Sequence, residues 1–501
     1  MGREAMQPVE LTESTGPDAT SPDAAGSGER AEADARRRWS RRRRWALAVA
    51  AALVVGLVST QAVLDARERA HLAHLATIPG VLAPVDASVG TLWSTNDESK
   101  IALLSGAPAG DLRISGYIDP AGERAVQAIR ARTGERAWST VLRAADPAAP
   151  AQGTALGPSC SLTGPAEAPG KVVCLVTDAA YVTDDTGART PVAPTYARVV
   201  VLDPLTGTLQ GQRDAPTSAQ LGALDGLAVM AWRTDDGHLV LTGTEPVTGD
   251  VRWRFESPRA LADAVADDAA RYGTSGLRLM VVADHVAVGA SGGELWIFSR
   301  TGDLVHDAMT PAGRAWVQEP RRGLLAIVEF LDQSPSTTFL GPDGSPGPTL
   351  ATQFPSFPVD DGSVPNLVFS LDGVLTAWDA TTGVLVWTSS FQVSSTGVLL
   401  EGRLYAETSG GRLLALDAAT GATLWEQPLA VSSFSSLFTD GRSILALETV
   451  SAGRLSLVAF APEDGHRRWA SPLPLGVDYA WDWGSQLVGM SADGSFAVAL
   501  G

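Results

Sequence analysis

Short apolar stretches alternate with polar turns along the chain from Val81 to Gly501. Most of these stretches are bounded by Gly, Asp, Pro or Ser. The pattern predicts short β-strands joined by tight turns rather than helices. Representative predicted strands are Ile101–Leu104, Val172–Val176, Val199–Leu202, Leu239–Leu241, Leu277–Val282, Leu324–Val328, Ile444–Leu447 and Leu455–Phe460.

One unit of this pattern occurs twice in nearly the same form. Gly411–Trp425 reads GRLLALDAATGATLW and Gly373–Trp387 reads GVLTAWDATTGVLVW; they lie 38 residues apart and agree at eight of fifteen positions. In each unit a strand runs into a Thr-Gly turn, where glycine accepts a positive φ. A second strand then carries Trp four residues after the glycine. A repeat of this period predicts one supersecondary unit stacked many times.

The turn glycine marks eight copies of the unit. The copies are centred on Gly134, Gly207, Gly249, Gly302, Gly344, Gly383, Gly421 and Gly465. Five of them place Trp four residues later, at Trp138, Trp253, Trp387, Trp425 and Trp469, whereas Gly211, His306 and Pro348 take that place in the others. Most intervals between the glycines suit one four-stranded antiparallel blade each.

A single β-blade has two apolar faces and open edges, so packing into a closed ring is the expected solution. We therefore predict an all-β, eight-bladed β-propeller over residues 81–501. Strands around Trp93 and within Ala492–Leu500 are expected to share one blade and close the ring. Seven blades are the first alternative because the copy at Gly344 is weak, and nine would require a whole blade between Trp93 and Gly134.

The residues before Val81 have a different character. Residues 1–44 lack apolar periodicity and are predicted to be a disordered tail with a polybasic end. Trp45–Leu64 is twenty uncharged residues, the length of a transmembrane helix, and residues 65–80 suit a juxtamembrane stalk. The arginines before this span predict a single-pass plasma-membrane protein with a cytoplasmic N-terminus and an extracytoplasmic propeller. A cleaved signal peptide is the alternative.

The charge of the chain restricts its partners. The formal net charge is −18, and the first 44 residues hold nine basic and eight acidic side chains, which leaves 29 basic and 48 acidic ones for the remainder. An acidic globular part argues against nucleic-acid binding, which needs a basic surface. It also argues against docking of that part on anionic lipid headgroups.

Two local features stand outside the repeat. Cys160 and Cys174 are the two cysteines, and outside the cytoplasm a disulfide is expected, with two free buried thiols as the alternative. Trp481 and Trp483 flank an Asp on one face of a predicted strand. They suit either an exposed aromatic binding platform or packing between blades. A short surface helix is also predicted over Ala260–Tyr272.

The sequence Ala-x-Asp-x-x-Thr-Gly-x-x-x-Trp, from Ala415 to Trp425, resembles the tryptophan-docking repeat of the PQQ-like (quinoprotein alcohol dehydrogenase-like) β-propellers. Asp417 and Gly421 match the motif, as do Asp379 and Gly383 in the copy ending at Trp387. The resemblance implies that the Trp packs between neighbouring blades while the Asp and Thr-Gly fix the turn. The repeat is therefore a signature of the fold rather than of an activity.

The same resemblance implies two functional classes. One comprises periplasmic dehydrogenases that bind pyrroloquinoline quinone and Ca²⁺ in the central channel; the other comprises cofactor-free scaffolds, such as the lipoprotein of outer-membrane protein assembly. The enzymes carry an adjacent Cys-Cys pair on the quinone, whereas Cys160 and Cys174 are not adjacent, and no set of Ca²⁺ ligands stands out. We therefore expect a non-enzymatic scaffold for envelope proteins, without quinone, calcium or other metal. A quinoprotein dehydrogenase or a small-ligand sensor using the channel is the alternative.

Overall fold

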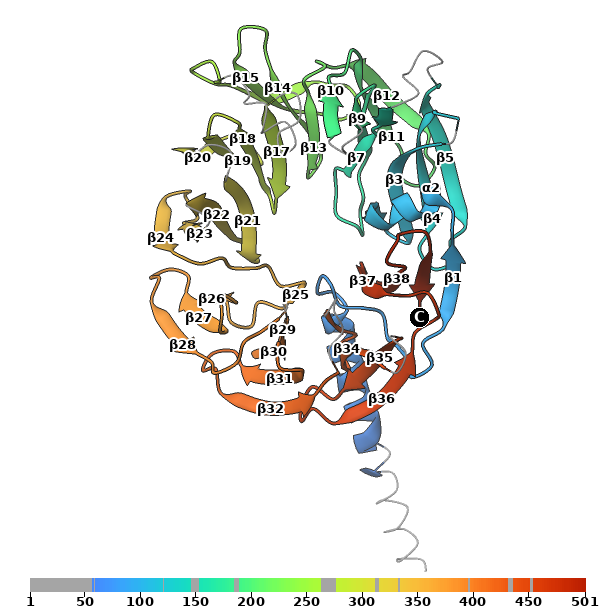
Figure 1. The fold of residues 1–501 in the computed structure, drawn as a ribbon, viewed down its shortest axis with the longest axis vertical. Helices are drawn as coiled ribbons and strands as arrows, with labels where there is room; N and C mark the ends of the chain where they lie inside the picture. The colour runs from blue at the N-terminus through green and yellow to red at the C-terminus, as the bar shows by residue number, and fades with distance from the viewer. Residues whose placement is uncertain are drawn as a thin grey trace, which may run out of the picture. The chain divides into compact units, whose positions relative to one another are not determined.

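The computed structural model describes residues 56–501 apart from 58, 120, 146–152, 184–188, 263–275, 311–314, 332–333, 395–396, 431–435 and 451–453. The chain divides into two compact units, Met1–His71 and Leu72–Gly501. The second unit is a closed ring of antiparallel blades around a central channel, the arrangement of a β-propeller (Figure 1). The predicted all-β propeller is therefore confirmed.

The ring contains nine blades, numbered here along the chain, and each runs from an inner strand to a strand on the outer rim. Blade 1 contains β2 (Ala107–Ala109), β3 (Leu112–Ile118), β4 (Arg124–Arg130) and β5 (Arg136–Arg143). Blade 2 contains β7 (Ser159–Leu162), β8 (Val172–Thr177), β11 (Ala197–Leu202) and β12 (Leu209–Asp214). Blade 3 contains β13 (Gln220–Leu224), β14 (Leu227–Arg233), β15 (Leu239–Thr244) and β16 (Val251–Glu256).

The next blades follow the same order. Blade 4 contains β17 (Leu277–Val282), β18 (His285–Ala290), β19 (Glu294–Ser299) and β20 (Leu304–Met309). Blade 5 contains β21 (Ala315–Arg321), β22 (Leu324–Leu331), β23 (Ser334–Leu340) and β24 (Pro346–Leu350). Blade 6 has three strands, β26 (Leu367–Ser370), β27 (Thr376–Asp379) and β28 (Leu385–Thr388).

The last three blades complete the ring. Blade 7 contains β29 (Val398–Leu400), β30 (Arg403–Thr408), β31 (Arg412–Asp417) and β32 (Thr423–Pro428), and β25 (Val359–Asp360) adds to it in parallel with β29. Blade 8 contains β33 (Leu437–Thr439), β34 (Ile444–Thr449), β35 (Leu455–Phe460) and β36 (Arg467–Pro472). Blade 9 joins β37 (Tyr479–Trp483), β38 (Gln486–Met490) and β39 (Ala497–Leu500) to β1 (Thr91–Thr95).

The predicted count of eight blades is wrong by one, for a topological reason. The turn glycine joins the third strand of a blade to the fourth. In blade 9 these are β39, which ends the chain, and β1, which begins the ring, so no turn is present to be counted. Eight glycines therefore mark nine blades. The stretch from Trp93 to Gly134 holds β2, β3 and β4, which belong to blade 1.

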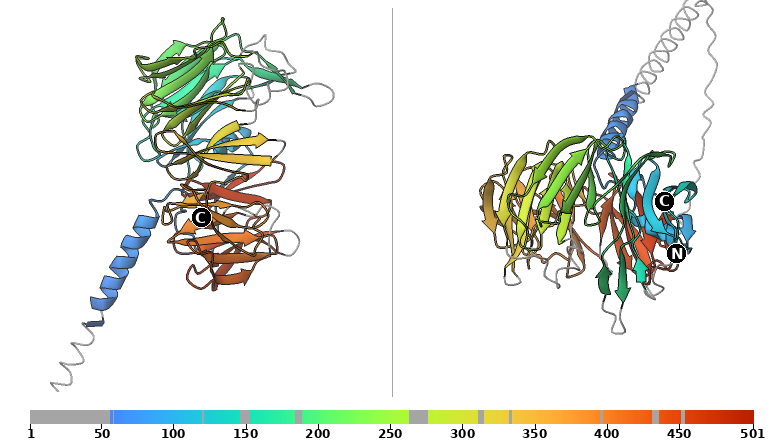
Figure 2. Two further views of the ribbon diagram at one scale, coloured as in Figure 1. Left: turned by 90° about the vertical axis from the view of Figure 1, so that its left-hand side faces the viewer. Right: turned by 90° about the horizontal axis from the view of Figure 1, so that it is seen from above.

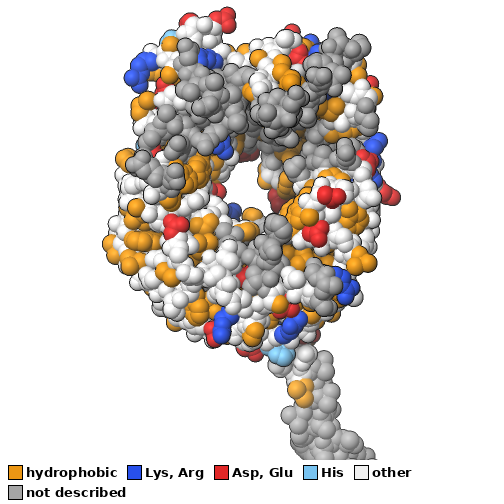
Figure 3. All heavy atoms as spheres, viewed as in Figure 1, with side chains coloured by type: hydrophobic (Ala, Val, Ile, Leu, Met, Phe, Trp, Pro, Cys, Tyr) orange, Lys and Arg blue, Asp and Glu red, His pale blue; other side chains and the backbone are white. Residues whose placement is uncertain are grey.

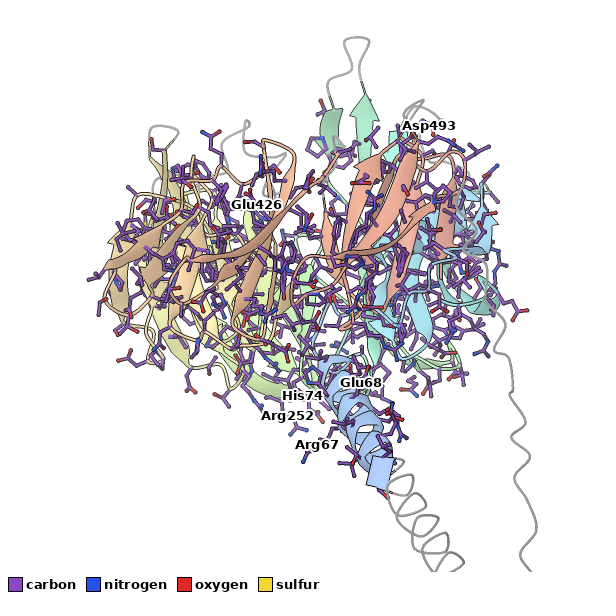
Figure 4. All side chains as sticks on the ribbon, turned by 90° about the horizontal axis from the view of Figure 1, so that it is seen from below. Arg67, Glu68, His74, Arg252, Glu426 and Asp493 are labelled. Atoms are coloured by element: carbon purple, nitrogen blue, oxygen red, sulfur yellow. A yellow bond between two sulfur atoms is a disulfide. The ribbon has the colours of Figure 1, made fainter. Side chains whose placement is uncertain are left out.

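The predicted membrane helix is also corrected. Trp45–Leu64 lies largely outside the described residues, and among those described no helix is long and apolar enough to cross a membrane. The helical residues 59–75 instead carry charged side chains, of which Arg67 and Glu68 are seen in Figure 4. The structure therefore gives no support to a single-pass plasma-membrane protein, and that placement is withdrawn.

A few elements lie outside the blades. The short helices α2 (Glu98–Ile101) and η1 (Ala102–Ser105) connect blade 9 to blade 1. A small sheet of β6 (Gly153–Ala155), β9 (Ala180–Thr183) and β10 (Arg189–Val192) is inserted into blade 2 and projects from the ring (Figure 2). The helix predicted over Ala260–Tyr272 lies mostly outside the described residues.

Neighbouring blades are joined by one recurring contact. Trp387, on the outer strand of blade 6, lies against the turn glycine of blade 7, Gly421, where a Cβ atom would be 2.6 Å from the indole ring. Its indole N–H donates to the carbonyl of Ala418 at 3.0 Å. Large aromatics buried in this way contribute much of the packing between layers. The same contact joins Trp93 to Gly134, Trp138 to Gly207, Trp253 to Gly302 and Trp425 to Gly465.

Candidate functional site

A connecting segment, residues 75–90, packs against blades 7 and 8 and leads into β1 of blade 9. Leu75, Ile78 and Val81 are buried in a cluster with side chains of blades 7 and 8. Leu82 N–H then donates to the carbonyl of Thr439 at 2.8 Å, and Gly90 exchanges two backbone hydrogen bonds with Gly501. The segment is therefore held by side-chain burial at its start and by the closing blade at its end.

Two cavities flank this segment, and Pro79 lines both of them. One has a volume of ≈ 460 Å³ and lies beside Arg321 and Asp360; the other has a volume of ≈ 440 Å³ and lies beside Arg113 and Ser485. We call them the Arg321 cavity and the Arg113 cavity. Figure 3 shows the opening at the centre of one face of the ring. Central openings of this kind are a common position for ligand sites in propellers and barrels.

The Arg321 cavity is bordered by a satisfied ion pair. Arg321 donates to both carboxylate oxygens of Asp360, at 2.5 and 2.8 Å, and the two side chains are only 3% and 10% exposed. Its remaining terminal nitrogen donates to the carbonyls of Val364 and Leu367 at 3.0 and 2.6 Å. Asp360 balances the charge of Arg321, and carboxylate or carbonyl oxygens accept from its nitrogens. This arginine therefore has a structural role: it links β21 of blade 5 to the segment from β25 to β26.

The Arg113 cavity is bordered by a buried charge with different partners. Arg113 is 4% exposed, and its guanidinium donates to the carbonyls of Leu112 at 3.2 Å and Trp483 at 2.5 Å. The guanidinium carbon lies 4.9 Å from the centre of the Trp483 ring. Among the described residues no carboxylate forms an ion pair with it. Burial accordingly lowers the pKa of Arg113.

The repeated aspartates sit in the turns that the motif implied. Asp379 Oδ1 accepts hydrogen bonds from the backbone N–H groups of Thr382 and Thr381 and from the Thr382 hydroxyl. The bonds from Thr382 are the main reason that the pKa of Asp379 is lowered. Asp417 accepts the same pair of bonds from Thr420. Both carboxylates are therefore used within their own turns, away from the cavities.

The cysteines form the predicted disulfide. Cys160 on β7 and Cys174 on β8 are directly opposite in the strand register, and their sulfur atoms are bonded at 2.10 Å. The bond therefore links the inner strand of blade 2 to its neighbour. Of the remaining motif residues, Trp469 packs partly buried against the apolar cluster that joins blades 8 and 9.

Trp481 and Trp483 lie on β37, the inner strand of blade 9. Trp483 is 4% exposed and makes an edge contact with Trp93 at 6.2 Å between ring centres. Trp481 is half-buried and stacks on Tyr479 at 5.5 Å. Both rings also pack in or against an apolar cluster that includes Ile129 and Ala131, at the junction of blade 9 with blade 1. Trp483 in addition contributes its carbonyl and ring to Arg113.

Sequence reasoning did not single out Arg113. It lies within an ordinary strand, and no motif distinguishes it from the other arginines of the chain. Its position becomes informative only when blades 1 and 9, which are distant in sequence, are brought together. Among the described residues, no group of three or more His, Cys, Asp or Glu side chains is placed to hold a metal ion.

Comparison with known proteins identifies the class of repeat. Residues 342–478, which run from the last strand of blade 5 to the end of blade 8, match the family described as outer membrane protein assembly factor BamB. The predicted PQQ-like repeat is thereby confirmed over this stretch, which is less than half of the chain. No curated protein matches the sequence.

Solved structures with related architecture include proteins of different function. BamB from Moraxella catarrhalis is 15% identical, with a TM-score of 0.38, and the match covers 83% of this chain and 98% of that one. Quinohemoprotein alcohol dehydrogenase from Comamonas testosteroni is 13% identical, with a TM-score of 0.36 and coverage of 84% and 78%. Saccharomyces cerevisiae Sqt1 is 10% identical, with a TM-score of 0.34 and coverage of 70% and 96%. Similarities this low carry no argument about function.

Proposed function

We propose that this propeller is a non-enzymatic scaffold that binds other proteins of the cell envelope. The observation that carries the proposal is the match of residues 342–478 to the family of an outer-membrane assembly factor. The Cys160–Cys174 disulfide supports an oxidising compartment, since such bonds persist mainly outside the cytoplasm. The acidic surface favours protein partners over nucleic acid.

The proposal is tested by cross-linking in the cells that make the protein. The full chain carrying an affinity tag is cross-linked, purified under denaturing conditions and analysed by mass spectrometry. We expect a small, reproducible set of envelope proteins whose cross-links fall on the ring. Recovery of only cytoplasmic proteins, or of a different set in each repeat, would contradict the proposal.

A scaffold also needs no redox cofactor, which separates it from the dehydrogenase alternative. A ligand that binds the folded state raises the melting temperature by mass action. We expect pyrroloquinoline quinone with Ca²⁺ to leave the melting temperature of the full chain unchanged. A rise in melting temperature, together with dye reduction that depends on an added alcohol, would contradict the scaffold proposal and indicate a dehydrogenase.

A further inference from the structure

Arg113 brings a positive charge to its cavity that no carboxylate of the described residues pairs with. An arginine has five N–H donors, and among the described residues Arg113 uses two of its nitrogens, both on neutral backbone carbonyls. Arginines this deeply buried are normally matched by a carboxylate, as Arg321 is by Asp360. The two arginines border neighbouring cavities, so the contrast between them is internal to one molecule.

The local backbone makes room for this guanidinium. Gly484, in the turn between β37 and β38, has a φ of +67°, and a Cβ there would clash with a terminal nitrogen of Arg113. Any larger residue would displace the guanidinium. The Trp483 ring covers one face of the charge by a cation–π contact. The guanidinium of Arg113 is thus fixed by residues of blade 9, and Arg113 lines the cavity.

The rest of the lining is mainly apolar or small. It is contributed by four parts of the chain: the connecting segment, β2 with the β2–β3 turn, the loop before β8 and the β37–β38 turn. Glu167, in the loop before β8, is the one carboxylate of the lining, and it is exposed. A volume of ≈ 440 Å³ is within the range of small-molecule sites.

We propose that the Arg113 cavity binds a monocarboxylate with an apolar body. A carboxylate fits the planar donor fork of arginine, and one negative charge balances one buried positive charge. A phosphate dianion would bring a second charge into an apolar cavity beside Glu167, at a cost in desolvation and repulsion. The carboxylate belongs either to a small organic acid or to the C-terminus of a bound polypeptide.

Calorimetric titration of the full chain with matched ligands tests this proposal. Hexanoate is compared with the neutral hexanamide, and a short leucine-rich peptide with a free C-terminus is compared with its amide. We expect binding of an acid and at least about tenfold weaker binding of its amide, because a charge-assisted hydrogen-bond pair is lost. Tighter binding of the peptide acid than of hexanoate identifies a polypeptide terminus, and the reverse identifies a small acid. Equal affinity for acids and amides would overturn the proposal.

Three variants of cavity residues and one control variant locate the site. Arg113→Gln is expected to weaken acid binding at least about tenfold, whereas Arg136→Gln, an exposed change on β5 of the same blade, leaves it unchanged. Glu167→Gln is exposed and spares the fold; it should tighten acid binding about twofold to fivefold by removing a like charge. Ala166→Phe should fill the cavity and abolish binding with Arg113 intact. Unchanged affinity in both Glu167→Gln and Ala166→Phe would overturn the assignment, even if Arg113→Gln fails to fold.

Discussion

Single residues hold the ring together through the contact between a docking side chain and the next turn glycine. The glycine has a double role there, because it adopts a positive φ and it leaves space for the neighbouring ring. Gly421 has a φ of +73° and lies against Trp387, whereas Gly402, in the same blade, has the same φ with open space around it. The two positions separate the cost of the backbone conformation from the cost of lost docking.

Alanine substitution at these two glycines should therefore give different results. We expect Gly402→Ala to lower the free energy of unfolding by about 1–2 kcal/mol, the cost of a left-handed non-glycine residue. Gly421→Ala should cost about 1–3 kcal/mol more, because the Trp387 ring must move. Urea denaturation followed by tryptophan fluorescence measures both. Equal losses would show that the docking contact contributes nothing at this junction.

A turn carboxylate in blade 9 gives a prediction about pH. The Ser491 hydroxyl and the N–H and hydroxyl groups of Ser495 donate to Asp493 and lower its pKa to about 2. Asp493 lies on the side of the ring from which the small β9–β10 sheet projects (Figure 4). A carboxylate with a lowered folded-state pKa stabilises the protein above its unfolded pKa, and this contribution disappears as pH falls through the folded value.

Ser495→Ala should consequently lower the melting temperature at neutral pH. The difference from the unaltered protein should shrink between about pH 4 and pH 2, where the carboxyl group becomes protonated in both states. Asp493→Asn serves as the control, because asparagine does not titrate in this pH range. In the Asp493→Asn background, the effect of Ser495→Ala on the melting temperature should not vary with pH. A difference that stays constant down to pH 2 would contradict the assignment of this pKa.

At the scale of elements, blade 2 differs from the others because it carries an insertion and a disulfide. The bond joins β7 to β8 directly, and the sequence separation of the two cysteines is 14 residues. Asp178 lies at the base of the inserted sheet, where it accepts bonds from the N–H groups of Thr195 and Tyr196. The disulfide links β7 to β8, and Asp178 links the end of β8 to the segment before β11.

Removing the disulfide should destabilise this blade first. A loop of this length contributes about 3 kcal/mol when it is closed. The Cys160→Ser, Cys174→Ser double variant should therefore unfold at lower urea, with the earliest gain in hydrogen exchange on β7 and β8. Dithiothreitol should reproduce the shift in the unaltered protein and have no effect on the double variant. Unaltered exchange on both strands would contradict a stabilising role.

The sequence predicts those elements whose information is local. Alternation and the Thr-Gly turns identify the blades, and the motif places Trp387 and Trp425 at the junctions, because each signal lies within fifteen residues. The number of blades was predicted incorrectly, because no turn joins β39 to β1. The Arg113 cavity was missed because blade 1, blade 9 and the connecting segment meet there only after the ring closes.

The whole molecule depends on closure of the ring at blade 9. Trp93 on β1 is 8% exposed, and its indole N–H donates to the Ala131 carbonyl at 2.7 Å. This contact crosses the junction of blade 9 with blade 1, which we call the seam. Leu92, its neighbour on the same strand, is 42% exposed. A ring has no free blade faces, whereas an opened ring exposes two. The seam should therefore matter for the stability of every blade.

Trp93→Ala should destabilise the protein by about 3–5 kcal/mol, the usual cost of truncating a buried tryptophan. Leu92→Ala should have an effect of about 0.5 kcal/mol or less, since that side chain is largely in solvent. Thermal denaturation with circular dichroism measures both variants. A similar, small effect of the two substitutions would show that the seam does not limit the stability of the ring.

If the propeller acts by binding another protein, the two proteins should form a complex that equilibrium binding can measure. The envelope protein identified by cross-linking is purified and titrated against the full chain, without quinone or calcium, while sedimentation velocity reports the complex. We expect a saturable complex of defined stoichiometry with a Kd of about 10 μM or tighter, corresponding to a binding free energy of about −7 kcal/mol. No complex at protein concentrations well above this value, with each candidate partner folded, would contradict it.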